Sequence, residues 1–127
     1  MSVLSKVLRD SPGNGLSFWC PGCDGPHRIQ HGAGDGPRWG WNGDVERPTF
    51  TPSVLTWWDE PAAAGNPDEL RAQVARKRAD PSYQIPYVKK TCHSFVTDGR
   101  IQFLGDCTHA LAGQTVPLAE FPEGWGC

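Results

Sequence analysis

The sequence has no long hydrophobic run. Nothing approaches the stretch of about 18 apolar residues that a membrane span needs, and Met1 to Asp10 has neither a long apolar segment nor a small-residue cleavage site. We therefore expect a soluble, cytosolic protein without contact to a membrane. Cytosolic thiols stay reduced, so the five cysteines favour metal binding over a disulfide framework.

The sequence also lacks the common catalytic motifs. It contains no Gly-x-Ser-x-Gly elbow, no phosphate-binding loop ending in Lys and Ser or Thr, no dinucleotide-binding glycine fingerprint and no His-Glu-x-x-His. These absences favour a protein that is not an enzyme.

Turn-forming and aromatic residues are abundant instead. Fifteen Gly, twelve Pro, six Trp and five Phe indicate many turns around an aromatic core. The fold class expected is α+β, mainly β, with a small zinc-stapled antiparallel core. Strands are predicted at 16–19, 38–41 and 49–57, and a β-hairpin at 92–105 turns at Asp98-Gly99. The N-terminal segment fits a short helix or an extended arm.

A single domain over 1–127 is expected, with its core at about 16–58 and 88–118. A helical insertion at about 59–87 separates the two parts. Asn66-Pro67-Asp68-Glu69 is a good helix start, and the surface helix predicted there covers about 67–79. From Asn66 to Lys90 there are six basic residues against three acidic ones, a local charge of +3, although the net charge of the chain is −2.

Two groups of metal-ligand residues lie far apart in the sequence. Cys20-Pro21-Gly22-Cys23 has the form of a zinc knuckle, and the second group holds Cys92, His93, Cys107 and His109. Each group alone is too small for a tetrahedral shell, so we expect one zinc ion with four ligands drawn from both. Cys127 stands outside the groups and is predicted to be a free thiol.

The register of the hairpin decides which residue completes the shell. With a two-residue turn, the numbers of two residues that pair across the hairpin sum to 197. Cys92 then shares a face with Cys107, and His93 points to the other face. With a three-residue turn the residue numbers of a pair sum to 196. His93 then shares the face of Cys107 and becomes the fourth ligand, while Cys92 turns away. The sequence leaves both registers open.

Three further side chains belong near this site. His109 fits a metal ligand or a residue that donates to a thiolate, and His27 is able to turn back toward the metal. Asp106 is of the type that orients a metal-bound histidine. Each is also compatible with an ordinary structural role.

Two blocks of sequence resemble an uncharacterised phage and prophage family of small Cys/His proteins, some of which carry the label ammonia monooxygenase. The first runs from Trp39-Gly40-Trp41 to Thr51-Pro52-Ser53, and the second from Cys92-His93-Ser94-Phe95 to Asp106-Cys107-Thr108-His109. The resemblance implies a phage-associated accessory protein with its cysteines and histidines in the common core.

The function expected from the sequence is therefore a zinc-binding accessory or interaction module. Its expected partner is a macromolecule, protein rather than nucleic acid, contacted through Trp57, Trp58 and the basic helix. The alternative is a small zinc-dependent hydrolase in which a metal-bound water attacks a substrate near Asn42, Asp44 and His109.

Overall fold

The computed structural model describes residues 2–125. The chain forms two compact units: Met1–Thr56 together with Thr91–Cys127, and Trp57–Lys90. Cys127 lies outside the described residues. Within the described part, no helix is long and apolar enough to cross a membrane.

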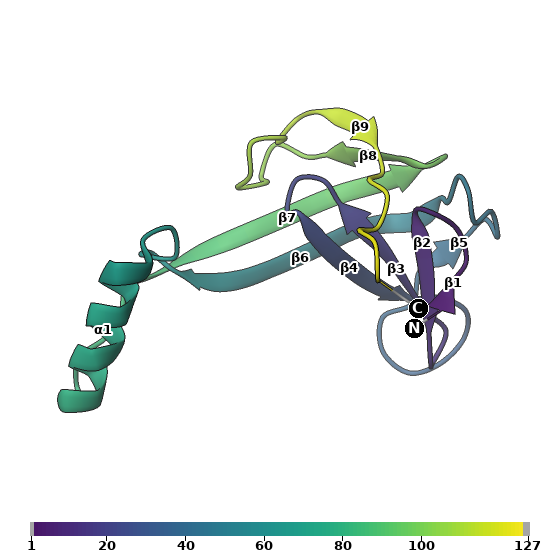
Figure 1. The fold of residues 1–127 in the computed structure, drawn as a ribbon. Helices are drawn as coiled ribbons and strands as arrows, with labels where there is room; N and C mark the ends of the chain where they lie inside the picture. The colour runs from purple at the N-terminus through teal and green to yellow at the C-terminus, as the bar shows by residue number, and fades with distance from the viewer. Residues whose placement is uncertain (1, 126–127) are drawn as a thin grey trace. The chain divides into compact units, whose positions relative to one another are not determined.

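The first sheet has four antiparallel strands in sequential order (Figure 1). They are β1 (Ser2–Val3), β2 (Leu8–Ser11), β3 (Gly15–Cys20) and β4 (Gly25–Gln30). The N-terminal segment is thus extended, because Leu8 pairs with Phe18 across β2 and β3 and both side chains are buried. The residues between Cys20 and Gly25 form the turn that joins β3 to β4.

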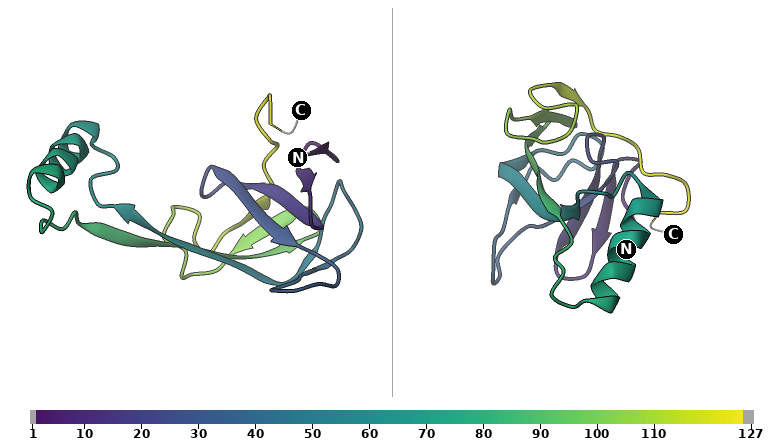
Figure 2. Two further views of the ribbon diagram at one scale, coloured as in Figure 1. Left: turned by 90° about the horizontal axis from the view of Figure 1, so that it is seen from below. Right: turned by 90° about the vertical axis from the view of Figure 1, so that its left-hand side faces the viewer.

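The second sheet has five strands in the order β5-β6-β7-β8-β9. These are β5 (Gly40–Trp41), β6 (Phe50–Pro61), β7 (Tyr87–Thr97), β8 (Arg100–Phe103) and β9 (Thr115–Pro117). Strands β6 and β7 run side by side in opposite directions (Figures 1 and 2). The prediction of a mainly antiparallel β protein with a Cys/His cluster is confirmed.

The β7–β8 hairpin adopts the two-residue turn. Val96 pairs with Ile101 and Thr97 with Arg100, which is the register that sums to 197. Asp98 and Gly99 have φ values of 52° and 74°, as a type I′ turn requires at both central positions. Successive strand residues face opposite sides, so Cys92 faces the core and His93 faces away from it.

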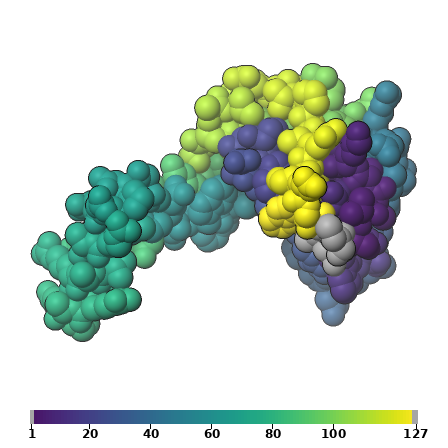
Figure 3. Space-filling view, in the orientation of Figure 1, coloured from purple at the N-terminus to yellow at the C-terminus, as the bar shows by residue number. Residues whose placement is uncertain are grey.

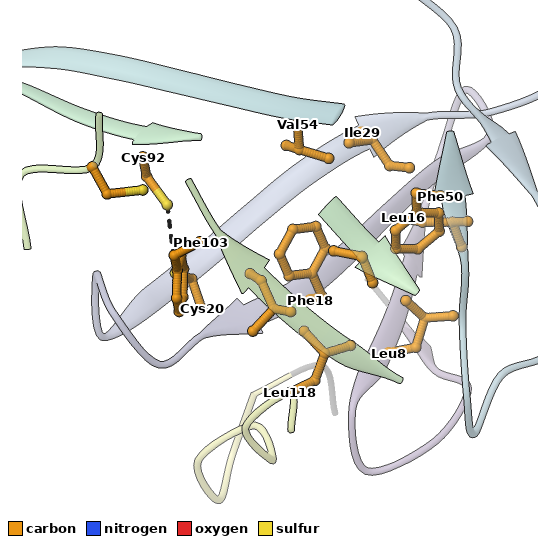
Figure 4. Close-up of a cluster of buried hydrophobic side chains, with 13 residues drawn as sticks. Leu8, Leu16, Phe18, Cys20, Ile29, Phe50, Val54, Cys92, Phe103 and Leu118 are labelled. Atoms are coloured by element: carbon orange, nitrogen blue, oxygen red, sulfur yellow. Dashed lines mark hydrogen bonds between the residues drawn. The ribbon is translucent and has the colours of Figure 1, made fainter. Parts of the chain in front are cut away.

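The core of the larger unit lies between the two sheets (Figure 4). Phe18 of β3 stacks on Phe50 of β6 with ring centroids 5.8 Å apart. The C-terminal segment lies against the N-terminal strands (Figure 3), where the Phe121 amide donates to the Lys6 carbonyl at 2.9 Å. Buried side chains from both sheets thus form one core.

The smaller unit contains the outer parts of β6 and β7 and the helix α1 (Pro67–Ala79) between them. The predicted helix bounds are confirmed, and the Asn66 side chain caps the helix by accepting from the Glu69 amide at 3.2 Å. No residue of α1 is buried, as its weak apolar face predicts. Trp57 is 60% exposed.

Candidate active site and metal centre

A serine and a histidine meet on the outer face of the second sheet. Val54 and Cys92 are buried in the core. Ser53 precedes Val54 and His93 follows Cys92, and because successive strand residues face opposite sides, Ser53 and His93 point away from the core. Ser53 Oγ lies 3.0 Å from His93 Nε2, although the two residues are 40 positions apart in the sequence. This contact brings a hydroxyl within reach of a potential base.

An aspartate completes a three-residue series. His93 Nδ1 lies 3.1 Å from Asp106 Oδ2, so one imidazole contacts a hydroxyl through one nitrogen and a carboxylate through the other. Both distances fall within the range of about 2.6–3.2 Å expected between a nucleophile, its base and the group that orients the base. Such a triad is identified by this geometry and not by the order of its members along the chain.

The segment that carries Asp106 is tied to β7 by backbone hydrogen bonds. The Thr108 amide donates to the Thr91 carbonyl at 2.9 Å, and the Leu104 amide donates to the His93 carbonyl at 2.9 Å. The Thr91 amide donates to Thr108 Oγ1 at 2.9 Å. Asp106 is therefore held beside His93 by the turn around it.

Four metal-ligand residues gather on the core side of the same strand. The candidate ligand atoms of Cys20, Cys23, Cys92 and His109 all lie within 4.8 Å of one another. Cys20 and Cys23 flank the β3–β4 turn, where the Cys23 amide donates to Cys20 Sγ at 3.4 Å. The cluster joins the first sheet to the second.

The spacing of this cluster fits a tetrahedral zinc shell. Zn–S bonds of about 2.3 Å and a Zn–N bond of about 2.0 Å place two sulfurs about 3.8 Å apart, and a sulfur and a nitrogen about 3.5 Å apart. Cys20 Sγ and Cys92 Sγ are 3.8 Å apart (Figure 4), and Cys92 Sγ lies 3.5 Å from His109 Nε2. Three sulfurs and one imidazole nitrogen are a donor set typical of structural zinc.

The three thiols also perturb one another. Hydrogen bonds from Cys23 and Cys92 hold the pKa of Cys20 well below its usual value, with a smaller contribution from His27. The hydrogen bond to Cys20 raises the pKa of Cys23 to about 12 and also raises the pKa of Cys92. These shifts follow from the close approach of the three sulfurs, and a bound cation would stabilise their thiolate forms.

His109 occupies a close-fitting place in the cluster. A Cβ built on Gly22 would lie 2.3 Å from its ring, so glycine is required there by the approach of the imidazole and not by a positive φ. The ring also packs edge-on against Phe103, with centroids 4.4 Å apart. The Leu111 amide donates to His109 Nδ1 at 3.2 Å, which puts the proton of the neutral ring on Nε2. Coordination of an ion through Nε2 would need the ring proton on Nδ1, and this hydrogen bond would then be lost.

The structure separates the six residues expected around one zinc ion. It brings Cys20, Cys23, Cys92 and His109 together, and it places His93 in the triad on the opposite side of β7. Cys107 contacts the backbone of His93, accepting from its amide and donating to its carbonyl, both at 3.2 Å. His27 is buried outside the four-residue cluster, with Nε2 unpartnered among the described residues.

Sequence reasoning missed Ser53 as a functional residue. Ser53 follows Thr51-Pro52 within β6, and no catalytic motif surrounds it. The available signal was the two-residue hairpin register, which turns His93 away from the metal and leaves it free beside Asp106.

A family model described as bacterial ubiquitination-like system serine protease (BubE) matches residues 3–104. The matched range contains Ser53 and His93, and its description carries no phage assignment and no ammonia monooxygenase label. Comparisons with curated proteins and with solved structures found no match. The expected function, a non-enzymatic zinc-binding accessory module of a phage, is therefore wrong, because the family is one of proteases. The error came from interpreting His93 and Asp106 as parts of a metal site. The chain belongs to the family of bacterial ubiquitination-like system serine proteases.

Proposed function

We propose that this chain is a serine protease in which Ser53 is the nucleophile, His93 the general base and Asp106 the residue that orients His93. The observation that carries the proposal is the continuous series of contacts from Ser53 Oγ through the His93 ring to Asp106 Oδ2, at 3.0 and 3.1 Å. The family match agrees with this chemistry.

The geometry supports acyl transfer in two steps. Asp106 accepts a hydrogen bond from His93 Nδ1–H, which leaves the Nε2 lone pair directed at the Ser53 hydroxyl. As Ser53 Oγ attacks the carbonyl carbon of a peptide bond, His93 takes its proton and then gives it to the leaving amine. Water, activated by the same imidazole, then hydrolyses the acyl-Ser53 ester. Proton transfer by such a base contributes about 10²–10⁴-fold to the rate.

A protein is the proposed substrate. The side chains of His93 and Asp106 are 25% and 55% exposed, so the triad lies open on a sheet face that an extended polypeptide can approach. The family description places its members in a ubiquitination-like system, and we propose that the substrate is a protein of such a system.

Zinc is the proposed occupant of the four-residue cluster. Cys20, Cys23, Cys92 and His109 would fill its coordination shell, leaving no position for a reacting water. Bound there, the ion supplies a cross-link between the two sheets. We also propose the bacterial cytoplasm as the location, since Cys20, Cys23, Cys92 and Cys107 form no disulfide and a thiolate site needs reduced ligands.

A peptide-cleavage assay tests the proposed activity. The purified protein is incubated with a mixture of synthetic peptides, and new termini are identified by mass spectrometry. We expect cleavage by the wild type and none above background by Ser53→Ala. Ser82→Ala is the matched control, because Ser82 Oγ contacts a carboxylate, Asp80 Oδ1, at 2.6 Å but lies outside the triad. Equal cleavage by the wild type and Ser53→Ala, or cleavage by neither, contradicts the proposal.

A further inference from the structure

The metal cluster and the triad use neighbouring residues of the same two segments. Cys92 precedes His93 on β7, and Asp106 and His109 belong to the same turn. We propose that the bound metal ion positions the triad, so that protease activity depends on metal occupancy and not only on the fold. This inference rests on the proposed function of Ser53, His93 and Asp106.

The two segments are joined on both sides of β7. On the outer side they are connected by the contact between His93 and Asp106. On the core side, Cys92 and His109 approach to 3.5 Å, and a shared metal ion would replace this weak contact with two coordinate bonds. The ion would thereby tie the strand that carries the base to the turn that carries its orienting carboxylate.

The other contacts between the two segments are hydrogen bonds, with no coordinate or covalent link. They join Thr91 to Thr108, the Leu104 amide to the His93 carbonyl, and the thiol of Cys107 to the His93 backbone. Thr108 is exposed, so water competes for its hydrogen bonds. The sulfurs of the three cysteines and the His109 nitrogen lie within 4.8 Å of one another, and without an ion only weak thiol contacts hold them there. Loss of the ion therefore favours outward relaxation of Cys92 and His109.

A small relaxation is enough to disable the triad. Its two contacts, 3.0 and 3.1 Å long, already lie at the long end of the catalytic range, and a displacement of about 1 Å costs on the order of 10²-fold in rate. His93 is bonded directly to Cys92, so it cannot stay in place while the cysteine moves. The core also contains Leu8, Leu16, Phe18 and Phe50, none of which is a candidate ligand, so it is expected to persist.

The central experiment compares zinc-loaded protein with protein stripped by a zinc chelator. The rate of covalent labelling of Ser53 by a fluorophosphonate is measured together with far-ultraviolet circular dichroism. The low-field proton NMR signal of the His93 Nδ1–H that donates to Asp106 is the readout independent of activity. We expect labelling to fall about 100-fold and the NMR signal to disappear while the dichroism is kept, and added zinc to restore both. A folded, metal-free chain that labels at the loaded rate overturns the inference.

A ligand variant covers the case in which the stripped protein unfolds. His109→Ala removes the one ligand on the segment that carries Asp106 and leaves the three cysteines in place, and Ser82→Ala, in the smaller unit, is the control. We expect His109→Ala to bind zinc more weakly and to label more slowly with its dichroism kept, and Ser82→Ala to label at the wild-type rate. A folded, zinc-free His109→Ala protein that labels at the wild-type rate overturns the inference.

The two proposals fail in different ways. If zinc-loaded wild-type protein takes no label on Ser53, the proposed protease function fails. If Ser53 is labelled equally with and without zinc, the protease function stands and the positioning role of the metal fails.

Discussion

Replacing Asp106 tests the triad at its most exposed member. Asp106 accepts a hydrogen bond from His93 Nδ1 at 3.1 Å, which selects the tautomer with a free lone pair on Nε2. Asn at this position offers an amide N–H to Nδ1 and favours the opposite tautomer, with the proton on Nε2 facing Ser53. In that state His93 cannot accept the hydroxyl proton.

The effect of removing the side chain altogether is expected to be smaller. The Asp106 side chain is 55% exposed, so in Asp106→Ala a water molecule can accept from Nδ1 and keep the productive tautomer. We expect a rate loss of about 10²-fold for Asp106→Ala, about 2.7 kcal/mol, and about 10⁴-fold for Asp106→Asn, about 5.4 kcal/mol. The isosteric substitution is thus the more damaging one.

The assay is the pseudo-first-order rate constant for fluorophosphonate labelling of zinc-loaded protein, with circular dichroism to confirm equal folding. Ser82→Ala is again the control. Rates within twofold of wild type for both Asp106 variants would refute the triad. A slower rate in Asp106→Ala than in Asp106→Asn would refute the tautomer argument while leaving Asp106 in the site.

Four further substitutions test the metal centre and its surroundings. Cys92→Ala is expected to lose zinc in metal analysis, whereas Cys107→Ala is expected to retain it and to slow Ser53 labelling through the His93 backbone; zinc loss in both would place Cys107 among the ligands. Gly22→Ala should weaken zinc binding at least 10-fold in a competition titration, because the added methyl group meets the His109 ring; unchanged affinity would contradict the position of His109. Ser94→Ala removes a buried hydroxyl without a partner among the described residues and should leave the free energy of unfolding unchanged or raise it by about 1 kcal/mol, measured by urea denaturation; a loss of more than about 1 kcal/mol would show that the hydroxyl is bonded.

Local sequence signals predicted the elements that depend on neighbouring residues. Asn66-Pro67 predicts the start of α1 because capping and proline at the first turn act within a few residues. Asp98-Gly99 predicts the hairpin turn because both residues tolerate a positive φ. The Cys20–Cys23 pair predicts half of the metal cluster for the same reason, since the spacing alone brings two sulfurs together.

The missed features depend on contacts between distant segments. Ser53 becomes a candidate nucleophile only when β6 lies beside β7, and no residue near Ser53 signals that pairing. Between residues 104 and 109 the chain turns so that Cys107 bonds to the His93 backbone. His109, and not Cys107, therefore lies in the four-residue cluster. Of the six plausible ligands in the sequence, four form the Cys/His cluster, His93 contacts Ser53 and Asp106, and Cys107 bonds to the His93 backbone. Only the three-dimensional arrangement shows this division.

Mapping of the covalent adduct tests the central claim most directly. Zinc-loaded wild-type protein is treated with a fluorophosphonate, digested and sequenced by tandem mass spectrometry. The account predicts one phosphonyl group per chain, attached to Ser53 and absent from His93→Ala. A chain that takes up no phosphonyl group, or carries it on a different residue, would contradict the assignment of Ser53, His93 and Asp106 as a catalytic triad.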